Sequence, residues 1–192
     1  MRIKISVLAL LPIFFLACSK NASVLYTNIP VNLVANPSFE TAAHHPDYNN
    51  WSGTVYITDS LGNQNPPLVQ DAPEGGGKWC VELHPLWMPS EGYTAAVITG
   101  QAGTNTYRLT AWMKTIYWHG SVALEHWRKG HMIGYKMVAD TAAMWKQVSL
   151  LDTLALLSDD WLKIHLSAGS TEVASGKARF DNIILEKINP GK

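Results

Sequence analysis

The sequence predicts an all-β protein, an antiparallel β-sandwich or barrel. Apolar and polar residues alternate along many short segments, which is the pattern of strands with one buried face. Turn-forming residues separate these segments at short intervals, as they do in sandwiches and barrels. No long stretch has the apolar spacing of an amphipathic helix, although residues 152–158 are compatible with one helical turn.

The N-terminus has the layout of a secretory signal. Arg2 and Lys4 precede an apolar run over residues 5–17, and this run ends in a small residue, Ala17. The run is too short to span a bilayer, which needs about 20 apolar residues. We therefore expect residues 1–17 to be a signal peptide that is removed on export. Its removal leaves 13 basic and 15 acidic residues, a net charge of −2.

Residues 15–20, Phe-Leu-Ala-Cys-Ser-Lys, resemble the bacterial lipobox, although Phe15 stands where the usual pattern prefers Leu. The resemblance implies that Cys18 is diacylated, and two acyl chains hold a protein stably at a membrane where one does not. Residues 18–30 are then a lipidated tether to the bacterial cell envelope. We expect an anchor in the outer membrane, and the side that the protein faces stays open. The alternative is an ordinary signal peptide that ends near a free cysteine.

The predicted strands lie between residues 31 and 188, a length that suits one domain. The clearest strand covers residues 105–114, where apolar positions 107, 109, 111 and 113 alternate with more polar ones. The other predicted strands are residues 31–35, 55–58, 78–84, 93–99, 120–127, 131–138, 146–151, 161–167 and 177–187. Turn-forming residues separate them at 61–63, 65–67, 74–77, 102–105 and 129–130.

Composition and motifs exclude several classes of function. No basic stripe marks a nucleic-acid surface. The sequence has no nucleophile elbow, Walker loop, dinucleotide fingerprint or His-Glu-x-x-His motif. His119 and His131 could approach each other across a hairpin, but a zinc site needs three or four converging ligands. The only cysteine besides Cys18 is Cys80, which we expect to be a small buried residue without a disulfide partner.

Segments at both ends of the domain narrow the choice among β-sandwich and barrel folds. Residues 32–40 read Asn-Leu-Val-Ala-Asn-Pro-Ser-Phe-Glu and precede Trp51, and residues 178–186 read Ala-Arg-Phe-Asp-Asn-Ile-Ile-Leu-Glu. Between them lie a Tyr-x-Leu-x-x-Trp segment at residues 107–112 and a Trp-x-x-Val segment at residues 145–148. In order and spacing, these segments resemble the galactose-binding domain-like jelly rolls, particularly carbohydrate-binding modules of families four, nine and twenty-two. The resemblance implies a jelly-roll β-sandwich that binds a polysaccharide or other glycan and is not an enzyme.

The resemblance also implies a structural calcium site. The first and last strands lie close together in such folds, which places Glu40 near Asp181. Two neighbouring carboxylates repel each other unless a proton or a cation lies between them. Calcium takes six to eight oxygen ligands, and we expect Glu40 and Asp181 to supply carboxylates while Ser38 and the loop near Lys78 supply backbone carbonyls. The alternative is that both carboxylates only accept hydrogen bonds from backbone N–H groups.

Eight tryptophans are many for one small domain, and a sugar site needs exposed flat rings beside hydrogen-bonding side chains. Trp51, Trp79 and Trp145 match positions that usually pack inside, and we expect Trp161 to be structural as well. The other candidates lie on an open sheet face or at loop ends. The predicted ligand-binding residues are Trp112, Glu125, Trp127 and Arg128 on strands, with Trp87, Tyr93 and Trp118 as a rim.

Two alternatives to a sugar-binding lipoprotein remain open. A lipid-anchored structural or protein-interaction module, with partners among envelope proteins, would share the fold and bind no glycan. A polysaccharide lyase could use Tyr117, His119 and His126 as acid and base, and a glycosidase would need two carboxylates that flank the sugar bond. The end segments favour the binding module, although a fold alone does not fix a function.

Overall fold

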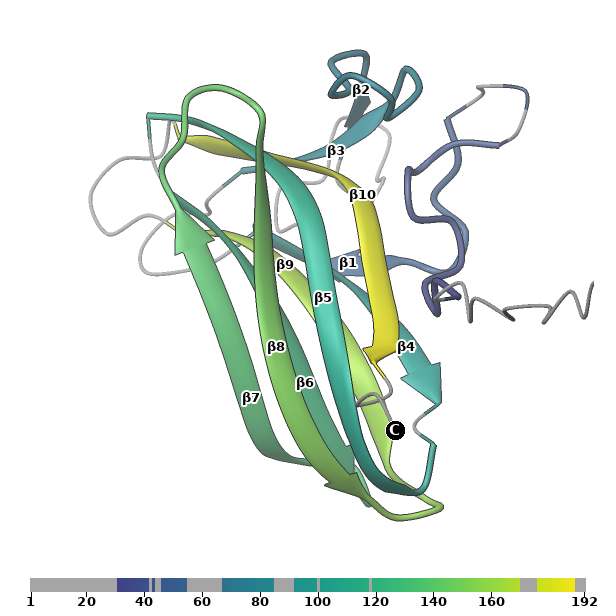
Figure 1. The fold of residues 1–192 in the computed structure, drawn as a ribbon. Helices are drawn as coiled ribbons and strands as arrows, with labels where there is room; N and C mark the ends of the chain where they lie inside the picture. The colour runs from purple at the N-terminus through teal and green to yellow at the C-terminus, as the bar shows by residue number, and fades with distance from the viewer. Residues whose placement is uncertain are drawn as a thin grey trace, which may run out of the picture.

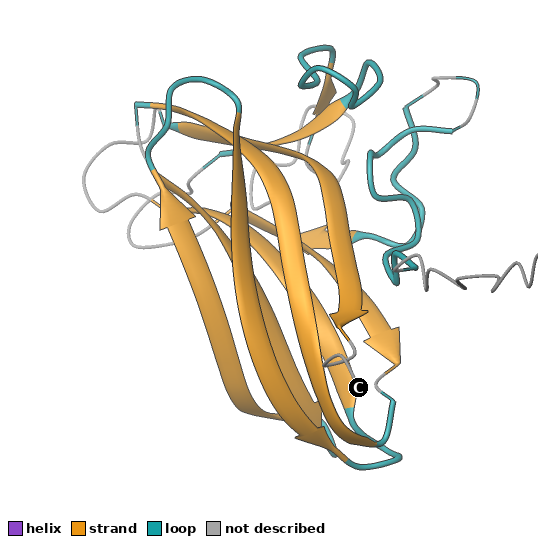
Figure 2. Ribbon diagram, in the orientation of Figure 1, coloured by secondary structure: helices purple, strands orange, loops and turns teal. Residues whose placement is uncertain are grey.

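The computed structural model describes residues 31–41, 43, 46–54, 67–84, 92–99, 101–117, 119–169 and 176–188. Over these residues the chain forms ten strands and no helix (Figure 2). The described part therefore holds no helix that is long and apolar enough to cross a membrane. The predicted signal peptide, the tether with Cys18, the strand at residues 55–58, Trp87 and Trp118 all lie outside the described residues.

The strands form two five-stranded antiparallel sheets, which pack face to face as the two layers of a sandwich (Figure 1). The first sheet, here called the β6 sheet, has the spatial order β1 (Ser52–Thr54), β4 (Gly92–Thr99), β9 (Trp161–Gly169), β6 (His119–Arg128) and β7 (His131–Asp140). The second, called the β5 sheet, has the order β2 (Leu68–Val69), β3 (Cys80–Leu83), β10 (Lys177–Ile188), β5 (Gly103–Ile116) and β8 (Lys146–Leu156). The predicted all-β antiparallel sandwich is confirmed.

Alternation along the strands places one side of each sheet in the core. On β5, the side chains at positions 107, 109, 111 and 113 are all buried, as the sequence predicts. On β9, Leu162, Ile164 and Leu166 are completely buried, and each such side chain stabilises the fold by about 1.5–3 kcal/mol. Phe39 and Trp51 also belong to this core, with ring centroids 4.8 Å apart. The core is therefore continuous from the start of the domain to its central strands.

Two segments differ from their predicted structure. Residues 31–35 form no strand, because the Asn32 side chain replaces most of a backbone ladder: its Oδ1 accepts a hydrogen bond from Leu185 N at 3.0 Å. Residues 152–158 form no helical turn, because β8 continues to Leu156 and pairs with β5 along its whole length. The short strands β1 and β2 were not predicted.

The predicted interior residues have mixed outcomes. Trp51 is 6% exposed, whereas Trp79 and Trp145, which were expected inside, are only half-buried. Cys80 is completely buried on β3, and its Sγ lies 3.4 Å from the carbonyl oxygen of Asp71. Burial, together with the nearby charge of Asp181, raises the pKa of the Cys80 thiol to about 12. Cys80 is therefore an inert structural residue, as expected.

Candidate functional site

The outer face of the β6 sheet carries a cluster of polar and aromatic side chains. On β6 and β9, the even-numbered residues 122, 124, 162, 164 and 166 are buried in the core. Because successive side chains of a strand point to opposite faces, the odd-numbered residues face outward. Five of these, at the end of the sheet where β6 ends and β9 begins, form what we call the outer cluster: Glu125, Trp127, Trp161, Lys163 and His165.

Two tryptophans lie side by side in this cluster. Trp127 and Trp161 are direct partners across β6 and β9. Their rings are stacked, with centroids 4.9 Å apart and planes inclined by 12°. The ammonium group of Lys163 lies 5.5 Å from the centroid of the Trp127 ring, which is the distance of a cation–π contact. Both tryptophans remain partly exposed, so the pair presents aromatic surface to the solvent.

Glu125 holds the outer cluster together. Its carboxylate accepts hydrogen bonds from Trp127 Nε1 and His165 Nδ1, both at 2.7 Å, and Lys163 Nζ lies 3.7 Å away. Burial opposes the charged form of Glu125, but the hydrogen bonds from His165 and Trp127 and the charge of Lys163 outweigh it, and the pKa of the carboxyl is lowered. Glu125 is therefore ionised at neutral pH, and it fixes the Trp127 ring in place.

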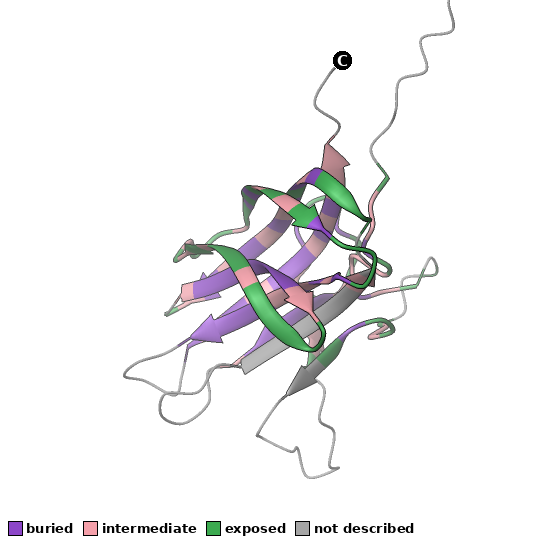
Figure 3. Cartoon of the chain, turned by 90° about the horizontal axis from the view of Figure 1, so that it is seen from below, coloured by how far each residue is buried: buried purple, intermediate pink, exposed green. Residues whose placement is uncertain are grey.

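Strand β7 forms the exposed margin of this face. Tyr135 lies opposite Glu125, and Met137 lies opposite Ala123. Tyr135 is 64% exposed and Met137 is 53% exposed, in contrast to the buried central strands of the sandwich (Figure 3). The outer face thus combines a half-covered aromatic pair, a fixed set of polar groups and an exposed tyrosine on three neighbouring strands.

Glu125 and Trp127, two of the predicted ligand-binding residues, lie together in the outer cluster, but Trp112 does not. The β5 side chains at 107, 109, 111 and 113 fill the core, so Trp112 is on the outer face of the β5 sheet. The outer faces of the two sheets point in opposite directions. The expectation that Trp112 and Trp127 line one surface is therefore wrong, because alternation along a strand does not say which sheet the strand joins.

Arg128, another predicted ligand-binding residue, is engaged elsewhere. Its Nε and Nη2 atoms both donate to the carboxylate of Asp160 at 2.7 Å, and the Asp160 side chain is completely buried. This pairing makes Arg128 part of the anchor of the β8–β9 loop. Tyr93, predicted at the rim, lies on β4, where its backbone pairs with that of Ser167 on β9. Its side chain is outside the described part of the structure.

Four residues of this face were missed by the sequence analysis. Trp161 was expected to be structural, and Lys163, His165 and Tyr135 were not considered. The sequence pattern could have revealed three of them, because Trp161, Lys163 and His165 on β9 alternate with strongly apolar residues. Tyr135 could not be assigned in the same way, because β7 is an edge strand that is exposed along much of its length.

Of the three residues considered for a lyase, Tyr117 and His119 line the same hollow, but His126 does not join them. Tyr117 lies just before β6, whereas His126 is near its other end, and the seven residue steps of β6 from His119 to His126 span roughly 23 Å. The imidazole of His126 is buried and hydrogen-bonded to Asp160 at 2.7 Å. Tyr117 and His126 therefore cannot act as acid and base on one sugar bond.

The predicted calcium ligands do converge, where the loop at residues 74–79 meets the start of the domain. Glu40 Oε1 accepts hydrogen bonds from Lys78 N at 2.8 Å and Trp79 N at 3.3 Å. Asp181 is completely buried, and its Oδ1 accepts one from Asn182 N at 2.7 Å. Asp181 Oδ2 has no hydrogen-bond partner among the described residues. Burial is the main cause that raises the pKa of Asp181 to about 8, and the negative charge of Glu40 adds to it.

Two glycines allow this close approach. A β-carbon at Gly76 would overlap Asp181 Oδ2, and one at Gly77 would overlap Glu40 Oε1. The resulting hollow of about 340 Å³ is lined by Ser38, Glu40, Thr41, Gly75, Gly76, Gly77 and Asn182. An unpartnered carboxylate oxygen beside a second carboxylate fits a hard cation such as calcium. No group of three or more His, Cys, Asp or Glu side chains in the described residues could hold a metal, so backbone oxygens would have to complete the shell.

No protein-family model matches the sequence, and no curated protein is similar to it in sequence. Solved structures share its fold. The enzymatically active domain of tailspike protein 4 from bacteriophage CBA120 has a TM-score of 0.60 at 16% identity over 82% of this chain, which spans only 22% of the tailspike chain. The CBM22-1 xylan-binding domain of Paenibacillus barcinonensis Xyn10C has a TM-score of 0.53 at 10% identity, covering 84% of this chain and 97% of that domain.

A third similar structure is the Clostridium thermocellum xylanase 10B fragment with CBM22-1 and GH10 modules, in complex with xylohexaose. Its TM-score is 0.53 at 10% identity, and the match covers 83% of this chain and 29% of that one. At these identities the similarity is one of fold. The chain therefore has the jelly-roll β-sandwich fold that carbohydrate-binding modules share.

Proposed function

We propose that this protein is a non-catalytic glycan-binding protein, and that the outer face of the β6 sheet binds a polysaccharide chain. The observation that carries the proposal is the stacked, partly exposed pair Trp127–Trp161. Sugar rings present apolar C–H faces, and aromatic side chains offer large flat surfaces that gain much from being covered. The hydroxyl groups of a sugar need hydrogen-bonding partners, which the half-buried Lys163 and His165 supply beside the rings, while the buried Glu125 holds them in place.

The fold supports this proposal independently of the side chains. The CBM22-1 xylan-binding domain, which has a similar fold, is a binding module, and the structural match extends over 97% of it. The accessible side chains of this face lie on three neighbouring strands, from the half-buried tryptophan pair on β6 and β9 to the exposed Tyr135 on β7. An extended surface of this kind suits a long chain better than a small molecule. The preformed ion pairs around Glu125 fix the side chains before a ligand arrives, which lowers the entropy lost on binding.

Affinity electrophoresis in gels that contain xylan, β-glucan or galactan tests the proposal. We expect Trp127→Ala and Trp161→Ala each to weaken retardation by roughly ten-fold or more. Trp112→Ala is the matched control, because it removes a half-buried strand tryptophan from the other sheet and should leave retardation unchanged. A protein that no gel retards, or equal losses in all three variants, would contradict the proposal.

A protein-interaction module is the second candidate, and exposed apolar side chains on β7 favour it. Met132, Ile133 and Met137 are each about half exposed on this strand, which is at the edge of its sheet within the described part of the chain. Edge strands of this kind can pair with another chain. Cross-linking to envelope proteins that is lost in a Met132→Lys/Met137→Lys variant, together with no binding to any glycan, would support this candidate.

We propose that a structural calcium ion binds between Glu40 and Asp181. Both carboxylates would hold the ion, and backbone oxygens near Ser38 would complete its shell. Bound calcium would neutralise the two acidic groups and fix the loop at residues 74–79 to the sandwich. We expect calcium to raise the melting temperature of EDTA-treated protein by roughly 5 °C or more, and Glu40→Gln to abolish this rise. An unchanged melting temperature, with no metal found by elemental analysis, would refute the site.

We also propose that the protein is exported and anchored in the outer membrane through lipid on Cys18, on the grounds of the lipobox-like sequence alone. Incorporation of labelled palmitate into the protein, and its loss in a Cys18→Ser variant, is the expected result. Labelling that persists in the variant would show that Cys18 is not the lipid site.

A further inference from the structure

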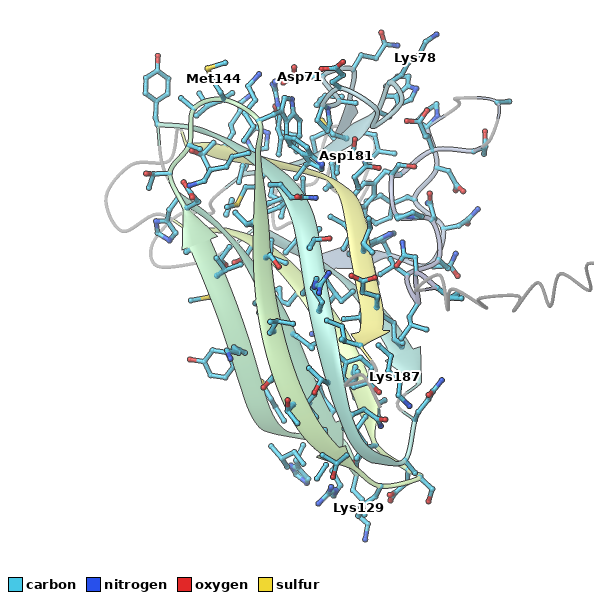
Figure 4. All side chains as sticks on the ribbon, in the orientation of Figure 1. Asp71, Lys78, Lys129, Met144, Asp181 and Lys187 are labelled. Atoms are coloured by element: carbon cyan, nitrogen blue, oxygen red, sulfur yellow. The ribbon has the colours of Figure 1, made fainter. Side chains whose placement is uncertain are left out.

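A second hollow lies at one end of the sandwich, far from the outer cluster. It has a volume of about 480 Å³ and is lined by Thr115, Tyr117, His119, Thr141 and Ala143. We call it the tip pocket. Its lining residues come from two crossings between the sheets, one from β5 to β6 and the other from β7 to β8. The nearby Met144 marks this end of the molecule, and Lys129 marks the opposite end (Figure 4).

The wall of the tip pocket is held in one arrangement by hydrogen bonds. Both the backbone N and the hydroxyl of Thr115 donate to the carbonyl oxygen of Ala142, at 2.8 and 3.1 Å. Asp140 Oδ1 accepts hydrogen bonds from the backbone N–H groups of Thr141 and Ala142, and Asp140 pairs with Lys146. The loop after β7 is therefore fixed on both sides, and the pocket exists before any ligand binds.

His119 is also fixed in position. A β-carbon at Gly169 would come within 2.7 Å of His119 Nε2, so the imidazole lies directly against the backbone of its partner strand. Gly120 next to it allows similarly close packing against Met113, whose Sδ would be 2.6 Å from an added β-carbon. Gly120 thus allows close packing between the two sheets, and Gly169 leaves room for the imidazole against its partner strand.

Tyr117 is held in a strained conformation at the rim. Its φ angle is 65°, in the left-handed region that bulky side chains rarely adopt. Its side chain is nevertheless 86% exposed, so no burial of the ring offsets the strain. Backbone strain of this kind concentrates at binding sites. Tyr117 also gives the tip pocket an exposed aromatic surface.

The lining indicates the kind of ligand. Its polar groups are the hydroxyls of Thr115, Tyr117 and Thr141 and the imidazole of His119, and the described lining includes no carboxylate, ammonium or guanidinium group. Such a lining suits an uncharged molecule with several hydroxyl groups and one apolar face. The volume lies in the range of about 300–1,000 Å³ that is typical of small-molecule sites.

We propose that the tip pocket is a second binding site, which takes a single neutral sugar residue, such as the terminal unit of a glycan chain. The class of ligand rests on the proposed function, but the site shares no residue with the outer cluster. A protein with both sites would hold a chain along the β6 sheet and a chain end at the tip. The two sites can therefore be tested and can fail separately.

The test is an NMR titration of the ¹⁵N-labelled full chain carrying Cys18→Ser, with glucose, galactose, xylose and mannose as probes. We expect at least one sugar to shift the amide signals of residues 115–119 and 141–143. Tyr117→Asn should weaken this binding at least ten-fold, because asparagine tolerates the left-handed backbone but removes the ring. Met144→Ala is the matched control, since Met144 is 80% exposed on the same loop and does not line the pocket.

The same titration on a Trp127→Ala/Trp161→Ala protein separates the two sites. We expect the sugar to shift the amide signals of the tip pocket equally in this double variant and in the protein without these substitutions. This result does not depend on whether the outer face binds a polysaccharide. The proposal is overturned if none of the four sugars shifts the tip signals, or if Met144→Ala weakens binding as much as Tyr117→Asn does. Loss of the tip shifts in the double variant would also overturn it, because the two sites would then not be independent.

Discussion

Asp160 and Asp181 are both buried, but their surroundings are opposite. Asp160 accepts four hydrogen bonds, from His126 Nε2, from Arg128 Nε and Nη2 and from Leu157 N, all between 2.7 and 2.9 Å. Arg128 is the main cause that holds the pKa of Asp160 well below its usual range. Within the described part of the chain, Asp181 has one backbone donor, no ion pair with a basic side chain and a raised pKa.

The difference separates a structural carboxylate from a candidate ligand site. A buried charge is tolerated when hydrogen bonds and an opposite charge surround it, and Asp160 has both within the chain. Asp181 lacks them among the described residues, so a proton or a cation from solution must take their place. Burial alone therefore does not reveal the role of an acidic residue, whereas an inventory of its partners does.

Removing Asp160 should have the largest effect. Asp160→Ala leaves the Arg128 guanidinium, the His126 imidazole and the Leu157 N–H without their acceptor, and we expect the melting temperature to fall by roughly 10 °C. The exposed neighbour Asp159 provides the control, because Asp159→Asn removes a negative charge near Arg128 without breaking these bonds. Melting temperatures are measured by circular dichroism. Similar falls in both variants would mean that the negative charge, and not the hydrogen bonds, stabilises the loop between β8 and β9.

Gly77→Ala should have an intermediate effect. The added methyl group would overlap Glu40 Oε1, which is fixed by the N–H groups of Lys78 and Trp79, and φ at this position is 89°. We expect a fall of roughly 5 °C in the melting temperature and a weaker response to calcium. Gly75→Ala has the same left-handed strain, with φ of 78°, but nothing within 4 Å of the new methyl group. Equal falls for the two variants would show that strain alone is responsible.

Asp181→Asn should have the smallest effect and the opposite sign. In cation-free buffer, folded Asp181 keeps its proton up to about pH 8, whereas the unfolded chain loses it near the ordinary value of 3.8. The folded state binds more protons between these values, so this group makes the free energy of unfolding fall as pH rises from about 4 to about 8.

An asparagine at this position would not be charged at any pH, so the substitution should remove that slope. We expect Asp181→Asn to raise the melting temperature by a few degrees at pH 8 without calcium and to change it little at pH 5. Glu74→Gln on the neighbouring loop is the control, since Glu74 is exposed. If the variant kept the pH slope of the natural protein, Asp181 would not be the titrating group.

Part of the candidate site was accessible to sequence analysis. Glu125 and Trp127 were found because they alternate with apolar residues on a clear strand, and Glu40 and Asp181 were found because they lie in end segments with a familiar order. Trp161 was missed although its strand alternates equally well, because a tryptophan beside an apolar run was taken to be packed inside. Arg128 was placed at the ligand, since nothing in its neighbourhood along the chain reveals a partner 32 residues away.

The sequence by itself determined the long strands, the side of each that is buried and therefore the sandwich, because the two-residue period of a strand is local information. Only the tertiary structure decided which strands are neighbours. That choice stacked Trp127 on Trp161, surrounded Glu125 with Lys163 and His165, and put Trp112 on the opposite face. Strand order depends on contacts between residues far apart along the chain, and no local pattern encodes them.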